Sequence, residues 1–149
     1  MTAKIRKMTE QDREEVKEMM QVFYHSPAVF TNGSEKIYNN DITACVGESP
    51  YAEGFIFEKD NKIAGYGMIA KSFSTEFGKP CIWIEDLYLK EEFRGEGIGS
   101  SFFRYLEKEY PDTIMRLEVE EENERAIAVY RKNGYETLPY MEMKKEVSD

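Results

Sequence analysis

The chain has 149 residues, of which 41% are hydrophobic and 13% are aromatic. This length suits one domain, and the apolar content is enough for one core, so the composition excludes a wholly disordered chain. With 20 basic and 29 acidic residues, the net charge of −9 argues against nucleic acid and anionic membranes as partners and favours cationic small molecules such as amines.

No part of the sequence approaches the roughly 20 apolar residues of a membrane span, and residues 1–7 lack the apolar run of a secretory signal. The expected compartment is therefore the cytoplasm. Cys45 and Cys81 have no metal-ligand spacing, so no metal is predicted. In such a chain, reduced and packed thiols are favoured over a disulfide.

The first half of the chain predicts one strand, two helices and a hairpin. The expected elements are a strand over 3–7, a helix over 9–24, a helix over 38–46 and an antiparallel hairpin of 51–58 and 62–70. Thr9 and Asp12 have the spacing of a capping box, which marks the start of the first helix. Glycines inside the second hairpin strand predict a bulge or a close approach of the backbone.

The second half alternates strands and helices. The expected order is a polar loop over 72–80, a strand over 82–89, a glycine-rich turn over 94–99, a helix ending before Pro111, a strand over 114–119, a helix from Asn123 to its cap at Gly134, and an edge strand over 137–145. The strand over 82–89 is apolar on both faces and is therefore expected at the centre of the sheet. The pattern predicts a single α/β domain over residues 1–149, antiparallel in its first half.

The turn Arg94-Gly95-Glu96-Gly97-Ile98-Gly99 follows a strand and opens a helix. Glycines let the backbone approach a bulky ligand, and the start of a helix presents unpaired N–H groups and a positive dipole. Together these features predict a pyrophosphate site built from main-chain amides, which an acidic protein could use. A tight turn without a ligand is the alternative. A dinucleotide fingerprint is a further one, although Ser100 stands where its third glycine belongs.

This turn, at the end of the strand over 84–89, resembles the acetyl-coenzyme A motif of the GNAT (Gcn5-related) N-acetyltransferases. The segment 123–135 resembles the family's second signature, and the order of elements is also that of the family. The segment 85–89 is similar to the corresponding strand of polyamine acetyltransferases. The resemblance implies a mixed central sheet in which two parallel strands splay apart around a cofactor cleft.

Acetyl-CoA is the cofactor that the resemblance implies. Main-chain groups of Leu87, Tyr88 and Leu89 would bind its pantetheine arm like an added strand. The residues expected to hold the pyrophosphate, the arm or the nucleotide are Arg94, Gly95, Glu96, Gly97, Ile98, Gly99, Ser100, Asn123, Arg125, Ala126 and Tyr130. An N–H near Leu87 would stabilise charge on the thioester carbonyl oxygen.

Acetyl transfer to an amine needs a base for the ammonium and an acid for the leaving thiolate. Period-2 alternation places Glu85 on one face with Trp83, Leu87 and Leu89, where apolar surroundings would raise the pKa of its carboxyl. The resemblance implies that Glu85 is the base. A hydrogen-bonded strand acid is the structural alternative, and a structural role is expected for Asp86, on the opposite face.

Tyr130 lies seven residues after Asn123, which puts both on one face of the last helix. The resemblance implies that Tyr130 is the general acid, and a packed core aromatic is the alternative. In the family the acceptor site is walled by the region after the first helix, so Tyr24 and His25 are expected to line it together with Glu85. For His25 a capping or surface role is the competing interpretation.

The sequence predicts an N-acetyltransferase that moves the acetyl group of acetyl-CoA to a primary amine by direct attack in a ternary complex. Neither cysteine lies in the motifs, so no covalent acetyl-enzyme is expected. The alternatives are a non-catalytic acetyl-CoA-binding module of the same fold and a dinucleotide oxidoreductase. The acceptor is a small-molecule or peptide amine whose identity the fold does not set, and the last strands offer a surface on which two copies could form a homodimer.

Several acidic side chains lie outside the two motifs. Glu76 lies in the predicted loop before the central strand, and Glu118 opens an acidic run through 120–122. Such residues usually form a solvated rim. They could also draw a cationic acceptor towards the predicted cleft.

Overall fold

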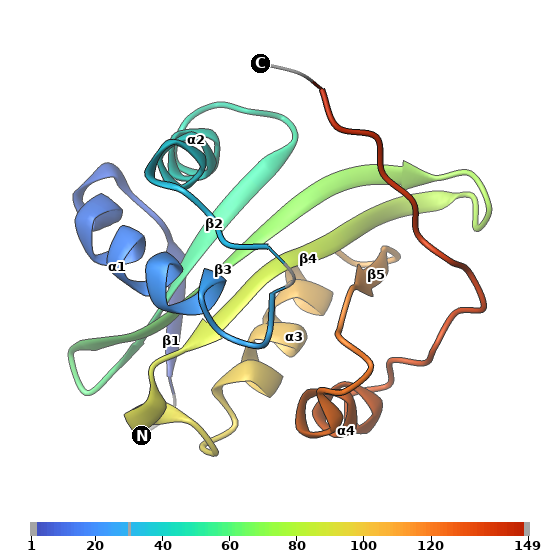
Figure 1. Ribbon diagram of the computed structural model, residues 1–149. Coiled ribbons are helices and arrows are strands. Elements are labelled where there is room, and N and C mark those ends of the chain that lie inside the picture. The colour runs from blue at the N-terminus through green and yellow to red at the C-terminus, as the bar shows by residue number, and fades with distance from the viewer. Residues whose placement is uncertain (1–2, 30, 148–149) are drawn as a thin grey trace.

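A computed structural model describes residues 3–29 and 31–147 of the protein. Five strands form one open sheet in the order β1-β2-β3-β4-β5, with helices on both faces (Figure 1). The strands are β1 (Lys4–Lys7), β2 (Ala52–Lys59), β3 (Lys62–Ser74), β4 (Lys79–Leu89) and β5 (Ile114–Leu117). The helices are α1 (Arg13–Tyr24), α2 (Glu35–Val46), α3 (Ile98–Glu109) and α4 (Glu124–Lys132), with short 3-10 helices η1 (Glu10–Asp12) and η2 (Glu91–Phe93).

Strands β1 to β4 pair antiparallel, and β5 pairs parallel to β4. This mixed sheet confirms the predicted fold class. The β2–β3 hairpin turns through Asp60 and Asn61, whose φ angles of 53° and 62° are those of the tight turns that match the twist of a hairpin.

The start of α1 is fixed by the predicted pair of Thr9 and Asp12. The Thr9 amide donates to the Asp12 carboxylate at 2.8 Å, and Arg6 donates to the same carboxylate through two nitrogens at 2.9 Å. These bonds hold the pKa of Asp12 below its usual value, with the hydrogen bonds from Arg6 as the largest cause. The capping box opens η1, and α1 continues from it to Tyr24 as predicted.

Each face of the sheet carries its own core. Helix α3 covers one face, and its buried residues Phe102, Phe103 and Leu106 pack against side chains of β2 to β5. Helices α1 and α2 cover the other face, where Met20 and Ile42 are fully buried. Figure 1 shows α1 and α2 on one side of the sheet and α3 and α4 on the other. The sheet therefore separates two cores, one under α3 and one under α1 and α2.

Two glycines of β3 confirm the predicted close approach of the backbone. A Cβ atom at Gly65 would lie 2.1 Å from the carbonyl oxygen of Tyr88, and one at Gly67 would lie 2.8 Å from the ring of Phe102. Real Cβ contacts are not this short. Gly65 therefore fixes the spacing of β3 and β4 near the end of β4, and Gly67 lets α3 pack closely on the sheet.

The predicted polar loop over 72–80 was wrong. Its two ends continue β3 to Ser74 and start β4 at Lys79, so only 75–78 form a turn. The ladder from Ser72–Cys81 to Ser74–Lys79 satisfies the main chain there. Polar side chains are tolerated because this end of the hairpin extends beyond the helices.

The predicted strand over 137–145 was also wrong, since this segment forms no strand. The strand over 114–119 is shorter than expected and ends at Leu117. Without a ladder partner, the alternation over 137–145 leaves Met141 and Met143 88% and 91% exposed. Figure 1 shows this C-terminal segment running from α4 past the end of the β3–β4 hairpin, where the Tyr140 hydroxyl donates to Glu76.

Cys45 and Cys81 are free thiols on α2 and β4. Burial raises the pKa of Cys45 to about 12, with smaller contributions from nearby carboxylates. None of the helices in the described residues is long and apolar enough to span a membrane.

Substitution of Gly65 tests the contact between β3 and β4. Gly65→Ala is expected to lower the free energy of unfolding by about 3 kcal/mol, because the new methyl group meets a main-chain carbonyl that cannot move without shifting β4. Urea unfolding measures the loss. The exposed Lys62→Ala on the same strand should stay within about 0.5 kcal/mol of the wild type, and equal stability of all three proteins would contradict the packing argument.

Candidate active site

The sheet opens between β4 and β5. The parallel pairing runs from Cys81–Ile114 to Ile84–Leu117 and then stops, while β4 continues to Leu89. Residues 85–89 therefore keep β3 on one side and have no strand on the other. Main-chain groups on that edge of β4 are available to an extended ligand. The Leu89 carbonyl is an exception, because it accepts a hydrogen bond from Arg94 Nε at 2.9 Å.

Glu85 is an extra residue in β4. The register shifts at this point, with Met68 opposite Asp86 and Ile69 opposite Ile84, so Glu85 has no partner on β3. Such a bulge bends the strand and redirects side chains. Glu85 is exposed at the edge of β4, but partial desolvation of its carboxyl raises its pKa above the usual value, with further contributions from Asp86 and Glu142.

The bulge overturns the predicted alternation along β4. Ile82 and Ile84 pack in the core under α3 before the bulge, whereas Leu87 and Leu89 do so after it. Glu85 therefore does not share a regular face with Trp83, Leu87 and Leu89. Period-2 reasoning fails here because one added residue exchanges the two faces of the strand.

Asp86 is a buried carboxyl, 3% exposed, on the face that α1 covers. Tyr24 of α1 and Tyr66 of β3 each donate a hydroxyl to it at 2.8 Å. Burial raises the pKa of Asp86, and the two hydrogen bonds oppose that change. These two hydrogen bonds fit the structural role predicted for Asp86. The bond from Tyr24 connects the end of α1 to the residue after the bulge, and lining of the acceptor site by Tyr24 stays a prediction.

The charge of Glu85 contributes to the raised pKa of two more carboxyls, Asp41 and Glu118. Burial, followed by Asp86 and Glu85, raises the pKa of Asp41 on α2 to about 6. A hydrogen bond shared with Glu142, followed by burial, raises the pKa of Glu118 to about 7. The sequence analysis missed Asp41 and Glu142. Asp41 is three residues after Tyr38, so one helical turn placed it on a covered face, but the sequence did not show which element would face it.

The glycine-rich turn presents a row of amides. The Arg94 amide donates to the Glu91 carbonyl at 3.2 Å, and the Ser101 amide donates to Gly97 at 3.0 Å. Between them, the amides of residues 95–100 have no acceptor within the part of the chain that the structure describes.

Gly95 and Gly97 adopt φ angles of 79° and 81°, in the left-handed region that favours glycine. A Cβ atom at either position would meet nothing within 4 Å, so the space above the turn is open. The one acidic side chain of the turn, Glu96, is paired with Lys59 of β2. The turn therefore fits an anion such as a pyrophosphate at the start of α3.

The other predicted cofactor residues lie on β4, at Arg94 and at the start of α4. The Arg94 guanidinium lies 5.8 Å from the centre of the Tyr88 ring. On α4, the Asn123 side chain accepts a hydrogen bond from the Ala126 amide at 3.2 Å and so caps the helix. Arg125 is exposed on the first turn. Contacts of Asn123, Arg125 and Ala126 with a cofactor stay predictions.

Tyr130 packs between aromatic rings under the open edge of the sheet. Its ring lies 5.9 Å from that of Phe103 and 6.2 Å from that of Tyr135, and it belongs to the core under α3. Burial raises the pKa of its hydroxyl. No hydrogen-bond partner of this hydroxyl is found among the described residues. A neutral, unengaged hydroxyl is what a general acid needs.

His25 lies at the C-terminal end of α1. It is exposed, and its Nδ1 is 2.7 Å from the Gln21 carbonyl of the preceding turn. This contact is local, whereas Tyr24 next to it points to Asp86. Lining of an acceptor pocket by His25 stays a prediction, and the structure gives the residue a contact at the helix end.

The arrangement combines an anion site and a basic group on opposite sides of one open strand edge. The amide row would hold a phosphorylated ligand, the edge of 85–89 would bind an extended arm, and Glu85 lies where that arm would end. A carboxyl with a raised pKa can take a proton from an amine near neutral pH. Such a site can transfer a group from an extended, phosphorylated carrier to an amine.

Comparisons with known proteins agree with this arrangement. The profile of the acetyltransferase (GNAT) family matches residues 14–135. The thialysine N-epsilon-acetyltransferase of Bos taurus is 37% identical over 79 residues, which cover 51% of this chain and 46% of that protein. The chain thus spans about half of that relative's length.

Solved structures share the fold. A possible acetyltransferase from Clostridium difficile 630 has a TM-score of 0.82 at 20% identity, covering 100% of both chains. AAC(6')-Iy, in complex with the bisubstrate analog CoA-S-monomethyl-acetylneamine, has a TM-score of 0.77 at 14% identity, covering 99% of this chain and 100% of that one. At these identities the structures establish the fold alone.

Titration of Asp41 tests the group of carboxyls. Its pKa is raised in the folded protein, so the stability that the protonated carboxyl contributes is present at low pH and is lost as the pH rises through about 6. Asp41→Asn mimics the protonated form. It should gain stability over the wild type between about pH 4 and 6 and keep that gain above pH 6.

Urea unfolding across this pH range measures the difference between the two proteins. Glu48→Gln removes an exposed carboxyl from the loop after α2 and serves as the matched control. A difference between Asp41→Asn and the wild type that does not change with pH would show that the carboxyl is not held in a charge-disfavouring site.

Proposed function

The chain belongs to the acetyltransferase (GNAT) family, and from that premise we propose that it is an N-acetyltransferase that moves the acetyl group of acetyl-CoA to a primary amine. One observation supports this more than the others. The bulged Glu85 lies on the open edge of β4, and the same strand leads into a turn whose six amides, 95–100, have no acceptor in the described residues.

The cofactor contributes an activated thioester when bound. The amides of 95–100 would hold its diphosphate, and the free edge of residues 85–89 would bind its arm through main-chain hydrogen bonds. An N–H near Leu87 would lie beside the carbonyl oxygen of the acetyl group. The open space above Gly95 and Gly97 and the pairing of Glu96 with Lys59 make this turn fit a polyanion despite the net charge of −9.

Glu85 and Tyr130 would move the protons. An ammonium group cannot attack, so Glu85 takes one proton from it, directly or through water, and leaves the amine lone pair free. The amine nitrogen would then bond the acetyl carbon as the carbon–sulfur bond breaks. Tyr130 would give a proton to the departing thiolate, and the second proton of the nitrogen, lost as the amide forms, would pass through solvent to restore the Tyr130 hydroxyl. Neither cysteine lies on the open edge, so direct transfer in a ternary complex is favoured over an acetyl-cysteine.

The acceptor is a primary amine held near several carboxyls. Asp41, Asp86 and Glu118 surround Glu85 and attract a cation. The thialysine acetyltransferase that matches half of the chain supports a small amine as the acceptor. Peptide amines remain among the compounds to be tried, because the family fold alone does not set the acceptor.

Binding and turnover together test this proposal. Isothermal titration should show binding of acetyl-CoA and none of NAD, and free CoA should be released in the presence of at least one member of an amine panel. Binding without release for any amine would favour a non-catalytic acetyl-CoA-binding module. Binding of NAD alone would favour a dinucleotide enzyme.

Tyr130→Phe tests the general acid. It keeps the ring packed against Phe103 and removes only the hydroxyl, so kcat should fall by about a hundredfold while the affinity for acetyl-CoA stays within roughly twofold. Tyr135→Phe removes a hydroxyl from the same aromatic group and is the matched control. Equal turnover in the wild type and Tyr130→Phe would remove Tyr130 from the mechanism.

Glu85→Gln tests the base through the pH–rate profile. In the wild type, kcat/KM should rise with pH as the Glu85 carboxyl, whose pKa is raised, loses its proton. Glutamine cannot titrate, so the variant should lose this low-pH limb as well as most of its rate. Glu92→Gln, an exposed change in η2, should keep the wild-type profile. An unchanged low-pH limb in Glu85→Gln would place the base elsewhere.

A further inference from the structure

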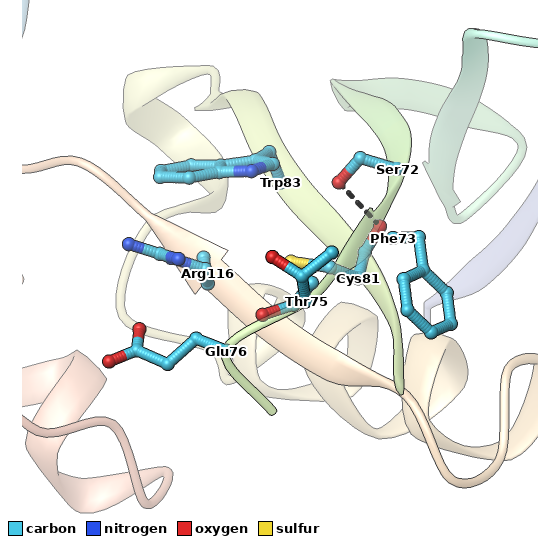
Figure 2. A pocket seen from close by; sticks show the side chains of 8 residues that line it. Ser72, Phe73, Thr75, Glu76, Cys81, Trp83 and Arg116 are labelled. Atoms are coloured by element: carbon cyan, nitrogen blue, oxygen red, sulfur yellow. Dashed lines mark hydrogen bonds between the residues drawn. The ribbon is translucent and has the colours of Figure 1, made fainter. Parts of the chain in front are cut away.

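A second polar feature lies next to the proposed site, where β4 and β5 are still paired. Trp83 and Arg116 are direct neighbours across the two strands, and the guanidinium carbon lies 4.5 Å from the centre of the indole ring. Figure 2 shows the Trp83 indole and the Arg116 side chain extending in the same direction, with the Glu76 carboxylate on the side of the guanidinium away from the indole. Stacking on the ring fixes the plane of the guanidinium and leaves its N–H edge exposed.

This guanidinium has no anionic partner. Within residues 3–29 and 31–147, no carboxylate forms an ion pair with Arg116, and no acceptor receives a hydrogen bond from it. In a chain of net charge −9, acidic side chains are abundant. The Glu76 carboxylate, which shares the pocket, accepts a hydrogen bond from Tyr140 instead.

Trp83 and Arg116 line a pocket of about 250 Å³ together with Ser72, Thr75 and Glu76. This volume is below the roughly 300–1,000 Å³ of sites that enclose a whole drug-sized ligand, so the pocket suits one end of a molecule. Its polar groups are a cation, a carboxylate and hydroxyls. That set complements a group that carries both a negative and a positive charge.

The pocket and the proposed base lie along the same pair of strands. Glu118 follows Arg116 by two residues and lies just beyond the end of β5. Glu85 follows Trp83 by two residues within β4, a step that covers roughly 7 Å of extended chain. The interval is close to the length of a lysine side chain.

We propose that this pocket binds the α-amino acid end of the acceptor, with the carboxylate on Arg116 and the α-ammonium towards Glu76. The reacting amine would then lie at Glu85, so the acceptor class is an amino acid with a distal primary amine. This inference rests on the proposed acetyl transfer. The inference narrows the acceptor class of that reaction. Carboxyls alone would favour any diamine, whereas Arg116 repels a second ammonium and attracts a carboxylate.

The single tryptophan of the chain makes the pocket directly observable. Trp83 fluorescence should change saturably with L-lysine in the presence of CoA. With 1,5-diaminopentane, which lacks only the carboxylate, binding should be at least about tenfold weaker. Arg116→Gln should weaken lysine binding by about tenfold to a hundredfold, the range expected for a charged hydrogen-bonded pair, and should make the two ligands nearly equal.

Arg104→Gln, which removes an exposed arginine from α3, is the matched control and should bind lysine like the wild type. Arg116→Lys keeps the charge but lacks the fork of donors, so its affinity for lysine should fall between those of the wild type and Arg116→Gln. Should Arg116→Gln fail to fold, the comparison of lysine with 1,5-diaminopentane on the wild type decides the question alone. Equal binding of the two ligands, or no change in Trp83 fluorescence with lysine, overturns the proposal.

CoA release separates the two proposals. Faster release with 1,5-diaminopentane than with lysine would overturn the amino acid pocket and leave acetyl transfer standing. A carboxylate-dependent change in Trp83 fluorescence without CoA release from any amine would overturn the proposed acetyl transfer and leave the amino acid pocket standing. Release with lysine that falls in Arg116→Gln mainly through a higher KM would support both.

Discussion

The bulge at Glu85 is the constraint on which the rest of the site depends. A regular β4 would continue the alternation of Ile82 and Ile84 and would turn Asp86 into the apolar core under α3, where a carboxylate without partners is costly. The added residue sends Asp86 to the opposite face, where Tyr24 and Tyr66 donate to it. It also returns Leu87 to the core, so the strand stays anchored after the pairing with β5 has ended.

Charge is distributed so that one acidic chain can attract both a polyanion and a cation. The amides of 95–100 carry partial positive charge without any basic side chain, and Lys59 neutralises Glu96 beside them. Asp86 and Glu85 contribute to the raised pKa of Asp41, and Glu85 also contributes to that of Glu118, so acidic groups gather around the bulge. In the proposed function main-chain donors would bind the anion, so the net charge of −9 would remain available to attract an amine.

The sequence predicted the fold well, because each element carries its own local signal. Thr9 and Asp12 marked the start of the first helix, and Gly134, with a φ of 94°, marked the end of the last. The glycine-rich turn was predictable for the same reason: its geometry depends only on adjacent residues.

Other features depend on partners that a sequence read alone does not show. The face of Glu85 was predicted wrongly because a bulge is defined by the register of two strands, here between Met68 and Ile69. Asp41 was missed because its pKa depends on Asp86, which is distant in sequence. The strand over 137–145 was wrong because alternation produces a strand only where a neighbouring edge pairs with it.

The two ends of the proposed acceptor groove share the C-terminal segment as a border. Tyr140 donates to Glu76 at the end with Trp83 and Arg116, and the charge of Glu142 contributes to the raised pKa of Glu85 at the end with the base. Met141 between them is almost fully exposed, so polar contacts rather than apolar packing hold this segment. Segments with few buried contacts open at low free-energy cost. In the proposed function the acceptor would therefore exchange where the structure is least packed, whereas the cofactor side is built on α3 and the sheet core.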